Sequence, residues 1–523
     1  MWEHHPVDAV FDPAPDDRPF AVVDIGSNSG RMIVFRLRHG EHLDVIEDAR
    51  APLRLARDLR DSDRLGPDAI ERTVEALRDF VAVAKGAGAT QMIAVATSAV
   101  RDAADGQELI ERAHRLGVPL QTIGGDLEAR LGFYGAVHDL PVTTGYTFDV
   151  GGGSAEVSSF RERRLVGSWS MPLGSLRVSD AYLSSDPPHE NEMRALRKAV
   201  KTSLTDAGIT ELGSDGQLIG IGGTVRNLAK IDLRRTDYPL PLLHGYRLTD
   251  KRLSAVIDDL AGRTMKRRAQ VPGLNPDRVD TIVGGALVIQ GIAKHVGATE
   301  VVVSSRGMRE GLALATEGAA TAPSPEWVRS ISVATLAVRF RTWNAAAAER
   351  RAGLAADLMA ALDPRAPLRL REMLAHSATL LDVGRAIDYY DRFEHAANIV
   401  VAADLVGFSH ADLGAITAIF RQADDDTRLG PYGRLVPDDD RPTVLRAATA
   451  LTIADELNRR IPPGAPAPIS CNWMRGGFEV VAPVPSGWHP RGVARRFRSV
   501  FGAELLVVAN ESAPVLAPAF EPD

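Results

Sequence analysis

Two glycine-rich turns, each preceded by an aspartate at the end of an apolar run, carry the residue types best suited to chemistry. Asp24 leads into Ile-Gly-Ser-Asn-Ser-Gly-Arg at 25–31, and Asp149 leads into Val-Gly-Gly-Gly-Ser-Ala-Glu at 150–156. Glycine lets backbone N–H groups approach an anion, and small hydroxyl and amide side chains add donors, so such turns can cradle phosphate oxygens. The aspartate can hold a divalent metal ion or a water beside that phosphate. Two such turns predict a cleft between two related halves.

A third glycine-rich turn supports the same chemistry. It contains Gly220, Gly222, Gly223 and Thr224, and it follows a short apolar stretch. The residues after it, through Asn227, are typical of a helix. A helix that begins at such a turn points its free N–H groups at an anion, so this turn is also predicted to face phosphate.

The elements that position these turns are short strands and amphipathic helices. Apolar runs rich in β-formers flank the first two turns, which predicts strand, tight turn and strand in each case. Between them, the pattern predicts a helix over 67–85, strands over 92–96 and 119–123, and a helix over 126–137. Strands that alternate with helices indicate an α/β architecture with mixed sheets.

The remaining sequence suggests further domains. We predict a disordered N-terminal arm (1–19), α/β domains I (20–138) and II (139–315), a mainly helical domain (326–460) and a small α+β C-terminal domain (469–523). Ala/Thr/Pro-rich and Pro-rich linkers at 316–325 and 461–468 separate the last domains.

Composition narrows the classes of function. The chain has 523 residues, of which 45% are hydrophobic and 25% charged, and this composition is typical of a globular protein with several domains. Cys471 is the single cysteine, which excludes a disulfide framework and fits a reducing compartment. No apolar run approaches the roughly 20 residues of a membrane span, and the first residues lack the pattern of a secretory signal. The net charge of -7 argues against nucleic-acid binding. We therefore expect a cytoplasmic protein without membrane or nucleic-acid partners.

The three turns resemble the phosphate and nucleotide loops of the actin, hexokinase and heat-shock-chaperone ATPase superfamily. Four further segments make the chain most similar to the exopolyphosphatase / guanosine pentaphosphate phosphatase (Ppx/GppA) family: Ala96–Ala103, Gly125–Leu131, Met171–Ser175 and Val303–Gly311. This resemblance implies two ribonuclease-H-like (actin-like ATPase) domains that form a cleft, followed by a helical HD-like domain and a small α+β domain. Because many family members pair through their C-terminal parts, it also implies a homodimer.

Phosphoanhydride hydrolysis requires neutralisation of phosphate charge, a positioned water and a base. By resemblance, Glu128 is the base; its position alone favours instead a solvent-facing first-turn glutamate stabilised by the helix dipole. The resemblance places Asp24, Asp149 and Glu156 around the phosphates and a Mg²⁺ or Mn²⁺ ion, with Asp149 also catalytic. It assigns Arg101 to the terminal phosphate, the alternative being a surface ion pair with Asp102 or Asp105. The remaining predicted substrate-binding residues are Ser27, Asn28, Gly152, Gly153, Ser154, Gly222, Gly223, Thr224 and Arg278.

The sequence departs from the family pattern at several positions. Leu381 precedes Asp382 where HD phosphohydrolases have histidine, and His395 alone does not complete a metal site. We therefore expect the helical domain to be structural or dimerising. Leu127 and Arg306 stand where the family commonly has acidic or small residues, which predicts altered charge near the cleft.

These observations favour an exopolyphosphatase, a hydrolase acting on phosphorus-containing acid anhydrides. The alternative with the same chemistry is a guanosine pentaphosphate 5'-phosphohydrolase. A sugar or acetate kinase and a non-catalytic polyphosphate or alarmone sensor are the alternatives from other classes.

Overall fold

The computed structural model describes residues 18–38, 42–59, 62–314, 321–424, 429–462 and 465–510. It divides the chain into two compact units, which meet in the sequence at Ile331 and Ser332. Some predictions lie outside the described residues: most of the N-terminal arm, parts of both linkers, and the end of the C-terminal domain after residue 510.

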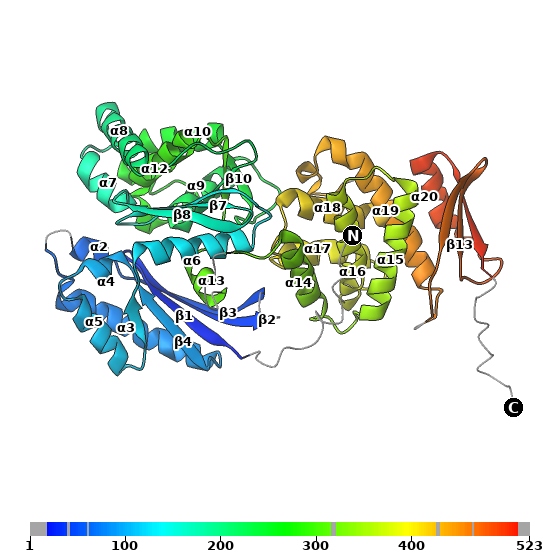
Figure 1. The fold of residues 1–523 in the computed structure, drawn as a ribbon, viewed down its shortest axis with the longest axis horizontal. Helices are drawn as coiled ribbons and strands as arrows, with labels where there is room; N and C mark the ends of the chain where they lie inside the picture. The colour runs from blue at the N-terminus through cyan, green and yellow to red at the C-terminus, as the bar shows by residue number, and fades with distance from the viewer. Residues whose placement is uncertain are drawn as a thin grey trace. The chain divides into compact units, whose positions relative to one another are not determined.

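The first half of unit 1 is built on a five-stranded sheet with the order β3-β2-β1-β4-β5 (Figure 1). Strand β1 runs antiparallel to β2 and parallel to β4, as expected for a mixed sheet. The strands are β1 (Phe20–Ile25), β2 (Ser29–Arg38), β3 (His42–Pro52), β4 (Gln91–Ala96) and β5 (Leu120–Thr122). The predicted strand–turn–strand at residues 20–35 is therefore confirmed.

The second half repeats this topology. Its strands are β6 (Gly145–Val150), β7 (Ala155–Arg161), β8 (Arg164–Met171), β9 (Gln217–Ile221), β10 (Tyr246–Thr249) and β11 (Glu300–Val303). They lie in the order β10-β11-β9-β6-β7-β8. Read from β8 to β11, strand order and directions match those from β3 to β5, and β10 is an additional antiparallel edge strand. The two halves are thus related by topology.

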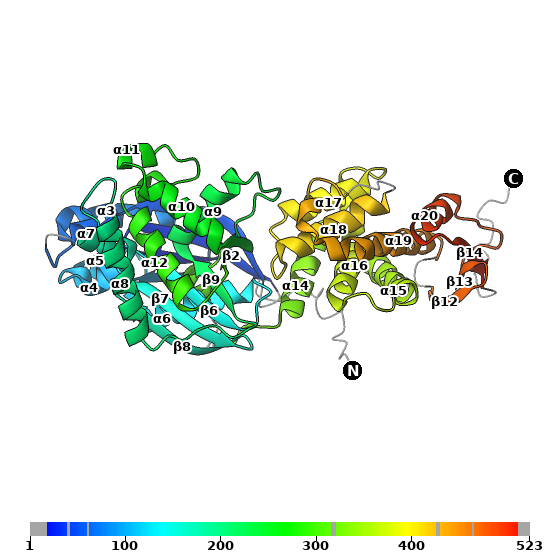
Figure 2. The ribbon, with the colours of Figure 1, turned by 90° about the horizontal axis from the view of Figure 1, so that it is seen from above.

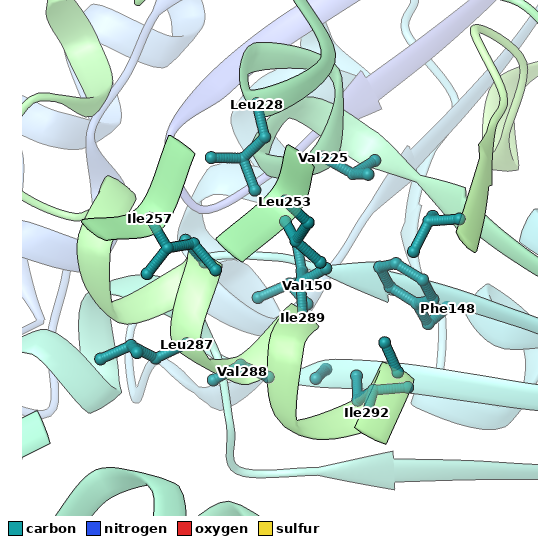
Figure 3. Packing of buried hydrophobic residues seen from close by; sticks show 14 of the residues in the cluster. Phe148, Val150, Val225, Leu228, Leu253, Ile257, Leu287, Val288, Ile289 and Ile292 are labelled. Carbon is teal, nitrogen blue, oxygen red and sulfur yellow. The ribbon is translucent and has the colours of Figure 1, made fainter. Parts of the chain in front are cut away.

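Helices cover one face of each sheet and bury apolar side chains there, which is the main source of stability in such layers. The helices are α3 (Gly66–Gly86) and α5 (Gly106–Arg115) in the first half, and α8 (Glu190–Asp206), α9 (Gly222–Arg235), α10 (Asp250–Ala261) and α12 (Ile282–His295) in the second. Figure 3 shows the second core, where Phe148 and Val150 of β6 pack among residues of α9, α10 and α12.

Two helices tie the halves together across their other faces. Helix α6 (Gly125–His138) packs against β7 and β8 of the second sheet, and α13 (Met308–Leu314) packs against β1, β2 and β3 of the first. The two helices also contact each other closely, because a Cβ at Gly311 would lie only 1.9 Å from the carbonyl oxygen of Leu131. Each of the two helices therefore packs on the sheet of the other half. This arrangement places the N-terminus of α6 at the border between the halves.

Unit 2 contains a helical bundle followed by a small sheet (Figures 1 and 2). Its helices include α15 (Ala345–Leu362), α16 (Leu368–Leu380), α17 (Arg392–Ala402), α18 (His410–Ala423) and α19 (Arg441–Asn458), and α14 (Pro325–Ala337) leads into it. Helix α20 (Arg491–Phe501) lies across the sheet of β12 (Ser470–Met474), β13 (Gly477–Ala482) and β14 (Glu504–Ala509). In the described ranges, no helix has the length and apolar character needed to cross a bilayer.

A buried charge network lies in the core of the bundle. The Arg351 Nη1 atom lies 2.9 Å from Asp382 Oδ2 and 3.4 Å from Asp455 Oδ1, and Arg392 pairs with both carboxylates as well. All four side chains are buried. Arg385 also lies 3.6 Å from Asp382, so three guanidinium groups neutralise this aspartate, which stands in the segment that resembles metal-binding HD domains.

Candidate functional site

The first two glycine-rich turns have the same backbone geometry. In the turn between β1 and β2, Gly26 N donates to Ser29 O over 3.2 Å; in the turn between β6 and β7, Gly151 N donates to Ser154 O over 3.0 Å. Asp24 is the next-to-last residue of β1 and Asp149 the next-to-last residue of β6, and their registers to the following strand are equivalent. The repeated motif in the sequence therefore corresponds to a repeated structure.

The third turn brings the start of α9 against the second turn. Gly222 has φ +81°, a conformation that glycine adopts without strain, and a Cβ there would lie 2.0 Å from Asp149 Oδ1. Gly223 lies equally close to the guanidinium of Arg278, which donates to Thr224 Oγ1 over 3.3 Å. The N-terminal turn of α9 thus faces both Asp149 and an arginine.

The three turns, the start of α6 and the loop before α13 enclose a cavity of about 180 Å³ within unit 1. Among the described residues, five carboxylates and six guanidinium groups line it. They belong to Asp24, Glu128, Asp149, Asp277 and Asp280, and to Arg31, Arg54, Arg57, Arg226, Arg278 and Arg309. Hydroxyl, amide and glycine backbone groups of the turns complete the lining. A site this rich in arginine and free N–H groups is suited to a multiply charged phosphate anion.

Most of the predicted site residues lie on this cavity: Asp24, Ser27, Asn28, Glu128, Asp149, Gly152, Ser154, Gly222, Gly223 and Arg278. Four do not. Thr224 is buried behind the turn and donates to Val150 O over 2.9 Å, and Gly153 faces a neighbouring pocket. Glu156 is buried opposite Asp149 in the β6–β7 register and accepts from Ser170 Oγ over 3.1 Å. Thr224, Gly153 and Glu156 therefore lie next to residues of the cavity lining but are not part of it.

Arg101 is the fourth residue away from the cavity lining. Its Nε atom donates to Asp102 over 3.1 Å and its Nη1 atom to the carbonyl oxygen of Ile123 over 2.9 Å. The ion pair with Asp102 is the alternative that the sequence left open. Arg101 nevertheless lies close enough to lower the pKa of Glu128, although burial and neighbouring carboxylates outweigh it.

Glu128 is the only residue of α6 on the cavity, and its carboxylate makes no hydrogen bond or ion pair within the described ranges. Burial raises the pKa of Glu128 well above its usual range, and the nearby carboxylates of Glu156, Asp24 and Asp149 raise it further. A carboxylate of raised pKa that faces a polar cavity can accept a proton from a bound water, so its position fits a general base.

The two strand-end aspartates differ in their partners. Arg309 Nη1 donates to Asp24 Oδ2 over 3.3 Å, whereas Asp149 makes no hydrogen bond or ion pair in the described part of the chain. Burial raises the pKa of both, and nearby arginines oppose this rise. Burial also raises the pKa of Glu156 to about 7. Burial is thus the main cause of the raised pKa of each of these carboxyl groups.

Sequence reasoning missed most of the arginines. Arg226 donates to Gly222 O over 2.8 Å and to Ser305 O over 3.1 Å, which fixes it beside the third turn. Burial lowers the pKa of Arg31 and of Arg226 to about 10, and the positive charge of Arg309 contributes to both shifts. Arg31 and Arg226 lie in two of the glycine-rich turn motifs, and Arg309 lies in the family segment Val303–Gly311. Their place in these motifs was the sequence signal that could have identified them as site residues.

The structure corrects the expectation for Arg306. Its Nε atom lies 3.0 Å from Asp139 Oδ2, and its side chain is mostly buried and absent from the cavity lining. Arg306 thus neutralises Asp139 at the end of α6 and adds no uncompensated charge to the cleft. Leu127 is half exposed and also does not line the cavity.

Comparison with known proteins agrees with this geometry. The sequence profile of the Ppx/GppA phosphatase family matches residues 33–319, and that of Ppx/GppA phosphatase domain III matches residues 328–474. Exopolyphosphatase 2 of Mycobacterium tuberculosis is 33% identical over 316 residues, which cover 57% of this chain and 98% of the relative. Exopolyphosphatase 1 of the same organism is 30% identical over 302 residues, covering 56% of this chain and 86% of the relative.

A crystal structure of the Aquifex aeolicus Ppx/GppA family member shares the fold of unit 1. It has a TM-score of 0.52 and 24% identity, and the match covers 57% of this chain and 96% of that structure. The actin-like fold and both family profiles agree with the repeated glycine-rich turns. The chain therefore belongs to the Ppx/GppA phosphatase family.

Proposed function

We propose that this protein is an exopolyphosphatase, which releases orthophosphate from the end of inorganic polyphosphate. The observation that carries the proposal is the unpartnered carboxylate of Glu128, which shares one cavity with two phosphate-type turns and six arginines. The described lining contains no aromatic side chain on which a purine could stack. This composition favours an inorganic chain over guanosine pentaphosphate, and the names of the Mycobacterium tuberculosis relatives support the same choice.

In the proposed reaction, the arginines and turn N–H groups bind the terminal phosphates and neutralise their charge. Glu128 accepts a proton from a water whose oxygen forms a bond to the terminal phosphorus. The anhydride bond to the next phosphate breaks, and its electron pair remains on the bridging oxygen of the shortened chain. Because Glu128 must be deprotonated to act, its raised pKa predicts that activity falls as the pH decreases towards that value.

A divalent cation fits the carboxylates of this cavity. Asp149 has no hydrogen bond or ion pair with another described residue, and its carboxylate oxygens are ligands that Mg²⁺ prefers; Asp24 is the second candidate. In the described ranges, no group of three or more His, Cys, Asp or Glu side chains has the spacing of a metal site. Mg²⁺ commonly takes one or two carboxylates and completes its shell with water and substrate phosphate. When bound, it would supply charge neutralisation on the phosphate oxygens.

Phosphate release from long-chain polyphosphate, in the presence of Mg²⁺, tests the proposal with wild type and Glu128→Gln. We expect wild-type turnover and a decrease in kcat of about 10²–10⁴-fold in the variant, because the general base is lost. Glu162→Gln, on the exposed turn after β7, is the matched control. Turnover of guanosine pentaphosphate alone would reassign the substrate. A variant as active as wild type would remove Glu128 from the mechanism, and binding without turnover would make the protein a sensor.

A further inference from the structure

Three arginines of the first half of unit 1 are paired with carboxylates of the second half; Arg54 and Arg57 line the cavity and Arg50 lies outside its lining, and we call this partly exposed group the mouth of the cavity. Arg50 Nη2 and Arg54 Nη2 each lie 3.1 Å from a carboxylate oxygen of Asp277, and Arg57 pairs with Asp280. The arginines lie on β3 and around the short helix α2 (Leu55–Asp58), and Asp277 lies in the 3-10 turn Pro276–Arg278. These ion pairs therefore bridge the two halves beside the substrate cavity.

The arginine side chains at the mouth are more exposed to solvent than Arg309, which contacts Asp24 inside the cavity. The side chains of Arg54 and Arg57 are 46% and 45% exposed, whereas that of Arg309 is 11% exposed. Water screens exposed ion pairs, so they are easily exchanged. A guanidinium binds phosphate oxygens with the same bidentate geometry that it uses for a carboxylate. A phosphate can therefore take the place of either aspartate.

The backbone of Arg54 shows that this arginine is held in place by the phosphate turn. Arg54 has φ +56°, a left-handed conformation that is costly for a residue with a Cβ. Its N–H donates to the carbonyl oxygen of Asn28 over 2.9 Å, as does that of Leu53 over 3.1 Å. The first phosphate turn thus fixes the position from which Arg54 extends to the mouth.

We propose that Arg50, Arg54 and Arg57 form an outer phosphate subsite, which Asp277 and Asp280 occupy until a polyphosphate chain displaces them. This inference rests on the proposed function and refines its substrate to long chains. The end of the chain occupies the turns, and its following phosphates replace the two carboxylates at the mouth. A long chain presents more phosphates beyond the turns than a short oligomer does, so we expect the outer arginines to contribute more to the binding of a long chain.

The double variant Asp277→Asn/Asp280→Asn tests this subsite, because it removes the competing charges while preserving side-chain size. We expect KM for long-chain polyphosphate to fall about three- to tenfold relative to KM for tripolyphosphate, since exposed pairs are weak. Arg57→Gln should change the same ratio in the opposite direction. Asp259→Asn is the matched control: Asp259 also pairs with two arginines on unit 1, Arg235 and Arg263, but does not line the cavity.

Direct binding separates this inference from the proposed function. Fluorescently labelled long-chain polyphosphate is titrated into Glu128→Gln protein with and without the two asparagine substitutions, and thermal denaturation checks that both are folded. Tighter binding in the substituted protein supports the outer subsite even if wild type shows no polyphosphatase activity. Unchanged or weaker binding in a folded variant overturns it, since the aspartates would then only hold the two halves together.

Discussion

Replacing Gly222 with alanine tests whether Asp149 must lie against the first turn of α9. A Cβ at residue 222 would lie 2.0 Å from Asp149 Oδ1 and 2.7 Å from its Cγ, whereas real Cβ contacts stay beyond about 3.0 Å. The carboxylate must therefore move by about 1 Å. Displacement by this distance of a group that positions the reactants costs on the order of 100-fold in rate. The left-handed φ adds about 1–2 kcal/mol of instability, and crowding adds about 1–3 kcal/mol.

Gly208→Ala is the matched control, because it has the same kind of backbone strain without the contact. Gly208 has φ +71°, and a Cβ there would have no neighbour within 4 Å. We expect Gly208→Ala to lose about 1–2 kcal/mol of stability and to retain its activity. The assay compares kcat/KM for phosphate release, after denaturant unfolding has confirmed that both variants are folded. If Gly222→Ala keeps kcat/KM within about threefold of Gly208→Ala, the reasoning about Asp149 is wrong.

Two further predictions concern charge. Glu156→Gln removes the neighbouring carboxylate that, after burial, contributes most to the raised pKa of Glu128. The pKa of Glu128 should therefore fall, and the acidic limb of the kcat/KM–pH profile should move to lower pH; an unmoved limb would contradict this coupling. In unit 2, Arg351→Met leaves two buried carboxylates undercompensated and should destabilise the fold by about 3–5 kcal/mol in denaturant unfolding. Arg350→Met, at the more exposed neighbouring position, should reduce the free energy of unfolding clearly less. Equal reductions in the two variants would contradict a particular contribution of the buried charge network to stability.

The glycine-rich turns and the elements around them could be predicted from the amino-acid sequence. Strands β1 and β6, with their aspartates and glycines, could be predicted because a tight turn and its flanking strands depend on neighbouring residues. Helices α3 and α6 were predicted to within about one residue of their bounds, since amphipathic periodicity is also a local signal. The family resemblance depended on the same short motifs.

Which of those residues meet in the cavity depends on long-range packing, which the local sequence does not encode. The contact between Arg309 and Asp24 joins residues 285 positions apart, and no local pattern encodes such a pair. No local pattern encodes the ion pairs of Arg50 and Arg54 with Asp277 at the mouth of the cavity, or the position of Glu156 behind the cavity wall. Side-chain charge and spacing show that a residue can bind phosphate, but the packing of distant helices and sheets decides where it points. Local interactions therefore specified the turns, and long-range packing assembled them into a site.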